Sequence, residues 1–135
     1  MRFLSLSFLA GLCLGTQTVF AGTAGEADVY DPEIPHAFDA GWKGQKTCEV
    51  LYEDATTRVG RCVFPPGVGH EWHYHNPHFG YVLEGGDLLI RDGQGEAEVT
   101  TIAGSTWSTD VRTVHQAVNI GDTTTSYLIV EPKSR

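Results

Sequence analysis

The sequence predicts an all-β protein, either a sandwich or a barrel of short strands. Three observations carry this prediction. Short runs rich in β-branched and aromatic residues recur along most of the chain. Clusters of Gly, Pro, Asn and Asp separate these runs, as expected for strands joined by turns. No segment after residue 21 keeps the period of 3.6 residues that is typical of an amphipathic helix.

The first 21 of the 135 residues are expected to be a secretory signal peptide, outside the fold. Arg2 supplies a positive charge, residues 3–15 form an apolar run, and Val19-Phe20-Ala21 fits a peptidase cleavage site. A membrane anchor is the alternative, but the apolar run is short for a span and residues 16–18 interrupt it. We therefore expect the mature chain, residues 22–135, to be secreted or periplasmic.

Residues 22–45 are polar and contain Pro32, Pro35 and several glycines, which predicts an extended N-terminal arm. Such an arm could cover a sheet edge in a partner subunit. Residues 46–135 are expected to form the single folded domain.

About nine strands are expected in the folded domain. Each is bounded by turn residues, for example Pro65-Pro66-Gly67 and Asp92-Gly93-Gln94-Gly95. The expected strands are residues 47–52, 57–64, 71–75, 80–83, 87–91, 96–102, 105–108, 114–119 and 126–131.

Cys48 and Cys62 form an even pair on two neighbouring expected strands. If the hairpin between them is centred on Ala55, the two cysteines lie directly opposite each other. In the oxidising compartment that a signal peptide implies, a cross-strand disulfide is then plausible. Two buried free thiols are the alternative, because the register is not fixed by the sequence.

The charge balance disfavours polyanionic partners. The chain has 17 acidic and 9 basic residues and a formal net charge of −8. Nucleic acids and anionic membranes both require clusters of Lys and Arg, and the sequence contains none. We expect no nucleic-acid partner, and no membrane association after signal cleavage.

Four of the six histidines fall between residues 70 and 78. His73 and His75 are two residues apart, so a β-strand would place both imidazoles on one face. His115, on a later expected strand, could complete a site with them. Imidazole binds Fe, Zn, Ni, Cu and Mn, so one divalent transition-metal ion is the expected cofactor.

Two segments resemble the sequence motifs of the cupin superfamily. Gly67, followed after five residues by His73-Tyr74-His75, is similar to the first motif, and the strand and glycine turn at residues 81–86 look like its end. Gly104, His115 and Asn119 match the second motif more loosely, because Asp110 and Arg112 stand where it usually has proline and glycine. The resemblance covers residues 47–131. It implies a small double-sheet jelly-roll barrel that holds a metal ion, and cupins commonly form homodimers.

The resemblance also implies a ligand set of two His, one Glu and a final His. Carried over, the histidine ligands are His73, His75 and His115. The glutamate is missing, and its place falls at His78 or at Phe79. If His78 takes that place, the site has four histidines. If Phe79 does, the site has three histidines and an open side.

Other residues near the motifs are weaker candidates. Glu71 shares strand parity with His73 and could be a general base, and Tyr81 could act as an acid or base. Gly80 is expected on the same side of its strand as His78, which would leave room near the ion for a small ligand.

Three polar residues are expected to lie outside the chemistry. His70 precedes the metal-binding strand and is expected at the rim of the site. His36, in the arm, is expected at the surface. Asn119 is expected to fix a strand end by hydrogen bonds.

The resulting hypothesis is a secreted, metal-binding cupin that acts on a small molecule. An Fe(II) site would support dioxygenase chemistry, and a Zn, Ni or Mn site would support Lewis-acid chemistry in a lyase, isomerase or hydrolase. The alternative is a non-catalytic module that binds a small ligand or a metal, because fold alone does not decide function.

Overall fold

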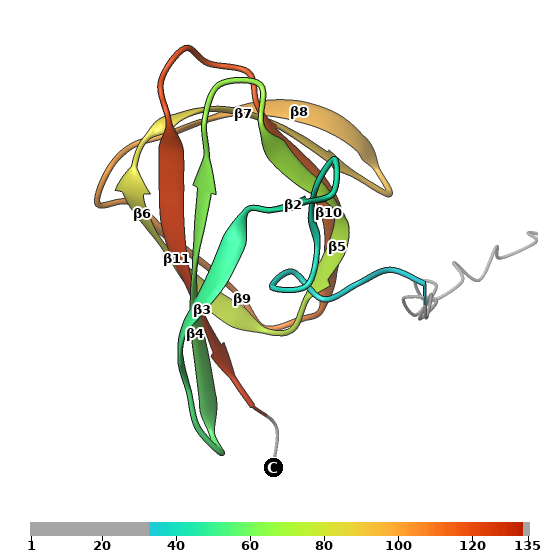
Figure 1. Ribbon diagram of the computed structural model, residues 1–135, viewed down its shortest axis with the longest axis vertical. Coiled ribbons are helices and arrows are strands. Elements are labelled where there is room, and N and C mark those ends of the chain that lie inside the picture. The colour runs from blue at the N-terminus through green and yellow to red at the C-terminus, as the bar shows by residue number, and fades with distance from the viewer. Residues whose placement is uncertain (1–32, 134–135) are drawn as a thin grey trace, which may run out of the picture. The chain divides into compact units, whose positions relative to one another are not determined.

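A computed structural model describes residues 33–133 of the chain, and they form eleven β-strands with short connections (Figure 1). The strands are β1 (Gly41–Trp42), β2 (Gln45–Lys46), β3 (Cys48–Glu53), β4 (Thr57–Phe64), β5 (Gly69–His75), β6 (His78–Glu84), β7 (Gly86–Asp92), β8 (Gly95–Thr101), β9 (Thr106–Thr109), β10 (Thr113–Asn119) and β11 (Thr125–Pro132). All nine strands expected from the sequence are present, and only the small hairpin of β1 and β2 was not anticipated.

Two antiparallel sheets make up the body of the fold. One has the strand order β5-β10-β7-β8 and the other has the order β3-β4-β11-β6-β9. Each sheet pairs strands that are distant in sequence, such as β5 with β10 and β4 with β11, as in a jelly roll, and the sheets face each other around a common interior (Figure 1). The all-β, double-sheet jelly-roll prediction is therefore confirmed. The strands β8 and β9 each form one edge of their sheet and are not paired with each other.

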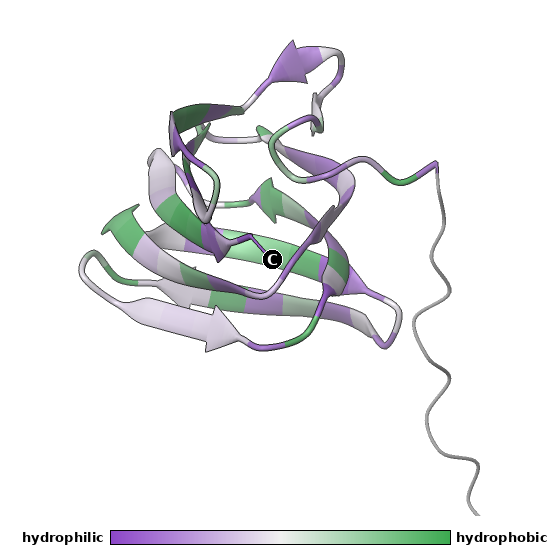
Figure 2. Ribbon diagram, turned by 90° about the horizontal axis from the view of Figure 1, so that it is seen from below, coloured by the Kyte–Doolittle hydropathy of each residue, from purple (hydrophilic) through white to green (hydrophobic). Residues whose placement is uncertain are grey.

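The interior follows from alternation of buried and exposed residues along several strands. On β6, for example, His78, Gly80 and Val82 are buried, whereas the residues between them are exposed. Figure 2 shows the same alternation as hydrophobic and hydrophilic bands along single strands. The main hydrophobic cluster comprises Phe38, Cys48, Cys62, Phe64, Leu88, Tyr127 and Ile129.

The hairpin of β3 and β4 carries a disulfide. Its register places Cys48 directly opposite Cys62, and the two sulfur atoms are bonded. The predicted cross-strand disulfide is thus confirmed, with both cysteines buried in the core. A bulge between Val50 and Tyr52 shifts the register nearer the turn. The pairing of Cys48 with Cys62 lies beyond this bulge and keeps its register.

The described part of the N-terminal arm covers an edge of this chain's own fold. Tyr74 on β5 donates its amide hydrogen to the Pro35 carbonyl oxygen, and the Ala37 amide donates to the Tyr74 carbonyl. The β5 edge is therefore closed by residues 35–37 of the same chain. Because Phe38 belongs to the hydrophobic core, the described part of the arm, residues 33–45, belongs to the folded unit.

The expected signal peptide, residues 1–21, lies outside the described residues. Within residues 33–133, no helix reaches the length and apolarity that a membrane span demands.

The disulfide closes a loop with a sequence separation of 14, so it restricts the unfolded chain. We predict that the double variant Cys48→Ser, Cys62→Ser lowers the free energy of unfolding by about 3 kcal/mol. Guanidinium denaturation of the oxidised protein and the variant measures this difference. Equal unfolding midpoints would contradict a stabilising role for the bridge.

Candidate metal centre

The pairing of β5 with β10 brings the main histidines together. His73 lies directly opposite His115, and Tyr74 lies opposite Val114. His73 and His75 are fully buried, whereas His115 is partly exposed. One nitrogen from each of these three imidazoles lies within 4.8 Å of the others. The structure thus gathers three of the four histidines proposed as ligands at one point between two strands.

A β-bulge decides which neighbours of this cluster face inward. On β10 only Gln116 separates the partners of His73 and His70, whereas two residues, Glu71 and Trp72, separate them on β5. A bulge of this kind changes the parity of a strand. His70 is therefore buried on the same side as His73, and its ring stacks on the His73 ring with centroids 3.8 Å apart. The expectation that His70 sits at the rim was wrong.

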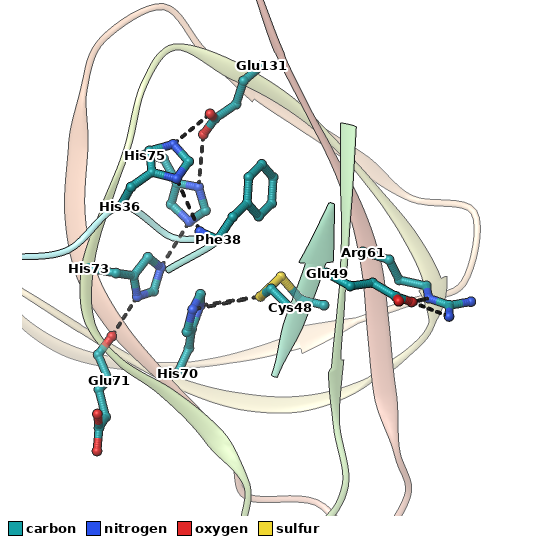
Figure 3. Close-up of a disulfide and its surroundings, with 11 residues drawn as sticks. His36, Phe38, Cys48, Glu49, Arg61, His70, Glu71, His73, His75 and Glu131 are labelled. Carbon is teal, nitrogen blue, oxygen red and sulfur yellow. Dashed lines mark hydrogen bonds and ion pairs between the residues drawn. A yellow bond between two sulfur atoms is a disulfide. The ribbon is translucent and has the colours of Figure 1, made fainter. Parts of the chain in front are cut away.

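The same bulge turns the Glu71 side chain away from the cluster. Glu71 is exposed, and its carboxylate accepts a hydrogen bond from the Lys43 amide at 3.0 Å. Its backbone carbonyl, however, accepts a 2.6 Å hydrogen bond from Nδ1 of His73 (Figure 3). The expectation that the Glu71 carboxylate faces the cluster was wrong, because it assumed regular alternation along β5. The bulge adds one residue between His70 and His73 and breaks that alternation.

The tautomer of His73 prepares it for a metal ion. Since its Nδ1 donates to a carbonyl oxygen, its Nε2 carries the free lone pair and lies 3.0 Å from Nε2 of His75. Two imidazole nitrogens bound to one tetrahedral Zn²⁺ lie about 3.3 Å apart. The spacing in the structure therefore fits two ligands of a single ion.

Glu131 orients His75 from the other side. Its Oε1 is 3.5 Å from Nδ1 of His75, and its Oε2 accepts a 2.8 Å hydrogen bond from Nε2 of His36 (Figure 3). The contact with His75 is too long for a hydrogen bond, and neither of these two buried atoms has a hydrogen-bond partner in the described structure. A proton on Nδ1 of His75 satisfies this carboxylate and leaves Nε2 for a metal ion, an arrangement typical of histidine ligands.

His78 is close to the cluster, but both of its ring nitrogens are engaged. Nδ1 lies 2.8 Å from the Asn76 carbonyl oxygen, and Nε2 accepts a 3.2 Å hydrogen bond from the indole of Trp107. The His78 ring lies 4.6 Å from that of His75, and one of its nitrogens groups with a nitrogen of His75 and a carboxylate oxygen of Glu131. The structure does not group it with His73 and His115.

The alternative position for the missing glutamate, Phe79, points outward and is 44% exposed. Gly80 points inward as expected, but the space beside it is filled. A Cβ atom on Gly80 would collide with the Trp107 ring. The expected room for a ligand at this glycine was therefore wrong, because an aromatic side chain from β9 occupies it.

Burial keeps the clustered imidazoles neutral. Desolvation, with the charges of neighbouring histidines, lowers the pKa of His70 to about 4 and that of His115 to about 3. Burial likewise lowers the pKa of His73 and that of His75. Burial opposes the charge of Glu131, but the hydrogen bond from His36 and the electrostatic contact with His75 outweigh it and lower the Glu131 pKa to about 2. Neutral imidazoles beside an ionised carboxylate favour a divalent cation.

A second group of metal-binding atom types lies next to the cluster. His70 is 3.7 Å from the sulfur of Cys48 and is grouped with both cysteines. Because those cysteines are bridged, their sulfur atoms are not available as thiolate ligands. The three-histidine group is therefore the better metal site.

A cavity of about 360 Å³ adjoins the cluster at His115. It lies between the two sheets, and its walls include Val82, Leu88, Ile90, Ala117, Trp107 and Tyr127. Exposed residues of the edge strand β8 and of the segment leading into β9 form its remaining wall. The cavity thus extends from the histidine cluster toward the edge strands β8 and β9, which are not paired with each other.

Tyr81 does not reach this cavity. Its side chain is 40% exposed and lies on the outer face of β6, one residue out of step with Gly80 and Val82. Asn119 behaves as expected. Its Nδ2 donates 2.7 Å hydrogen bonds to the carbonyls of Phe64 and Thr123, which fixes the end of β10.

Sequence reasoning missed Glu131 and misplaced His36. His36 is buried, with its ring packed edge-on against Tyr74, because the arm pairs with β5. Glu131 was detectable in principle. It continues the buried alternation of Tyr127 and Ile129 along β11, so a carboxylate there faces the interior.

Comparison with known proteins agrees with this architecture. The model of the cupin domain family matches residues 60–131. A cupin domain from Bordetella pertussis Tohama I superimposes with a TM-score of 0.62 at 21% identity, covering 76% of this chain and 98% of that one. The polyketide cyclase RemF from Streptomyces resistomycificus gives a TM-score of 0.54 at 23% identity, covering 76% of this chain and 71% of that one. No curated protein sequence matches the chain.

The fold and the cluster define a small double-sheet β-barrel protein with histidines grouped at one end of an internal cavity. The family match spans more than half of the sequence. The chain belongs to the cupin domain family, as its two motifs implied.

The lowered histidine pKa values predict how stability depends on pH. An unfolded histidine takes up a proton near pH 6.5, but His70 in the folded protein does so only near pH 4. Between these values the unfolded state binds more protons, so the metal-free protein should lose stability as pH falls from 6.5 to 4. Each such histidine contributes up to about 1.4 kcal/mol per pH unit.

Guanidinium denaturation in the presence of a chelator, at several pH values between 4 and 7, measures this slope. The variant His70→Gln, which cannot take the proton, should show a slope smaller by about 1.4 kcal/mol per pH unit. A stability that stays constant or rises as pH falls through this range would contradict the account.

Proposed function

We propose that this cupin is a metal-dependent enzyme for a small molecule, and that His73, His75 and His115 hold its one divalent transition-metal ion. The observation that carries the proposal is the convergence of three neutral imidazole nitrogens within 4.8 Å, one of them on the wall of a cavity. Three protein ligands leave a coordination position for substrate or water, which is the usual arrangement in catalytic sites.

Each residue has a distinct role in this proposal. The Glu71 carbonyl holds Nδ1 of His73, and the Glu131 carboxylate holds Nδ1 of His75, so both Nε2 atoms face the ion. His115 presents the open side of the site to the cavity. His36 keeps Glu131 oriented by its 2.8 Å contact.

The ion would act as a Lewis acid or, if it is iron, would allow oxygen chemistry. The residues around the cavity favour chemistry carried by the ion itself. Among the described residues that line it, only His115 and Tyr127 are titratable, and burial raises the pKa of Tyr127. A protein-supplied general base is therefore not part of the proposal. A non-catalytic binding module is the second candidate, and this lack of a base is the observation that favours it.

The ligand assignment predicts the metal content of variants. The protein, purified without chelators or a histidine tag, should carry one transition-metal ion per chain by elemental mass spectrometry. The double variant His73→Ala, His115→Ala should carry none, whereas His78→Gln should keep a stoichiometric ion because His78 is engaged by Trp107.

Far-ultraviolet circular dichroism of each variant shows whether the fold is kept. Loss of the metal in folded His78→Gln would replace the three-histidine assignment with a four-histidine one. A native protein that contains no metal and takes up none of Fe(II), Zn, Ni, Cu or Mn would refute the metalloenzyme proposal.

Glu131 provides a second test. Because its carboxylate fixes the tautomer of His75, Glu131→Gln should weaken zinc binding by about 10- to 100-fold. Glu71→Gln is the matched control, since that side chain is exposed and only its carbonyl contacts His73. Competition with a chromophoric chelator measures both affinities. Equal affinities for the two variants would mean that Glu131 does not act on the site.

The enzyme and binding-module candidates differ in the open position. Cobalt-substituted protein should change its visible d–d spectrum when azide is added, if an exchangeable position faces the cavity. A spectrum that does not respond would indicate a closed site, which favours the binding module.

A further inference from the structure

The lining of the cavity beside His115 indicates which class of small molecule can bind there. Its walls come from both sheets and from the edge strands, and most of its lining is aliphatic or aromatic. No Lys, Arg, Asp or Glu is among the described residues that line it. A charged group placed inside would lose its water without gaining a partner of opposite charge, which disfavours its binding.

Apart from His115, the polar side chains of the cavity carry neutral hydroxyls, and most of these lie at its exposed side. Thr100, Ser105 and Thr106 are all exposed and belong to β8 or to the segment that enters β9. Hydroxyls can bind a neutral oxygen but provide no charge for a phosphate or carboxylate. The opening of the cavity is thus as uncharged as its interior.

Two aromatic rings shape one wall. Trp107 and Tyr127 meet edge to face, with centroids 5.5 Å apart and ring planes at 78°. The indole N–H of Trp107 is already donated to His78, so this side chain offers the cavity its ring and not a hydrogen-bond donor. A flat apolar body packs well against such a wall.

We propose that the substrates of this site are uncharged, largely apolar small molecules that turn a hydroxyl or carbonyl oxygen toward His115. The class excludes sugar phosphates and small dicarboxylates, because the described lining offers them no cation other than the ion itself. This proposal rests on the proposed function for the role of the oxygen at the ion, but the preference for an uncharged body depends on the cavity alone.

The experiment compares two rigid probes of similar shape, 2,6-dihydroxynaphthalene and 2,6-naphthalenedicarboxylate. Both ends of the second are charged, so no orientation keeps the His115 end of the cavity free of charge. Isothermal titration calorimetry of the metal-free protein at pH 7 should show the diol binding at least 10-fold more tightly. Binding of the dicarboxylate with equal or greater affinity, or binding of neither probe, would overturn the proposal.

A matched pair of variants tests whether the two probes bind in this cavity. Val99 lines it and is 42% exposed, so Val99→Arg adds a cation at its opening without disturbing the core. Val111 is 59% exposed and does not line it, so Val111→Arg is the control. Only Val99→Arg should shift the preference toward the dicarboxylate, by at least 3-fold. An equal shift in both variants would place the probes elsewhere and overturn the proposal.

Titrations repeated on zinc-loaded protein separate this proposal from the function on which it rests. A gain in diol affinity with zinc supports both. If zinc does not bind at all, the proposed function fails. The preference for the diol over the dicarboxylate, measured on metal-free protein, still tests which class of ligand the cavity binds.

Discussion

The pairing of β5 with β10 is the interaction on which the histidine cluster depends. Opposite residues on adjacent strands share a face, and here His73 faces His115 across the ladder. A register slip of one residue would turn His73 and His75 toward solvent and leave His115 alone inside. The bulge at Glu71 and Trp72 is part of this constraint, since it sets the position of His70 without moving the ladder at His73.

The cluster is surrounded by groups that keep it rigid. The disulfide and the His70 ring support His73 from one side, and Glu131 with His36 supports His75 from the other (Figure 3). Because these supports come from β3, β5, β11 and the arm, both sheets contribute to the geometry of one site. Such support from surrounding residues is what holds metal ligands in place before the ion binds.

The sequence predicted the strands well because turn residues and alternating apolar residues act locally. It also pointed to His73, His75 and His115, which the structure brings together, since the spacing of two residues and the family motifs carry that information. It could not place Glu71 and His70, because a bulge depends on how many residues the partner strand supplies. The alternation along β11 turns Glu131 inward, but its partner His36 lies 95 residues away in sequence, so no local pattern encodes their contact or the burial of His36.

The central claim is that three imidazoles hold one ion whose open side faces the cavity. Anomalous diffraction at the zinc absorption edge, from crystals of the zinc-loaded protein, tests it most directly. The account predicts one peak about 2.1 Å from nitrogens of His73, His75 and His115, with its open position toward Trp107 and Tyr127. A peak coordinated instead by His78 and Glu131 would contradict it, because the ion would then lie in the neighbouring group that His75 shares with them.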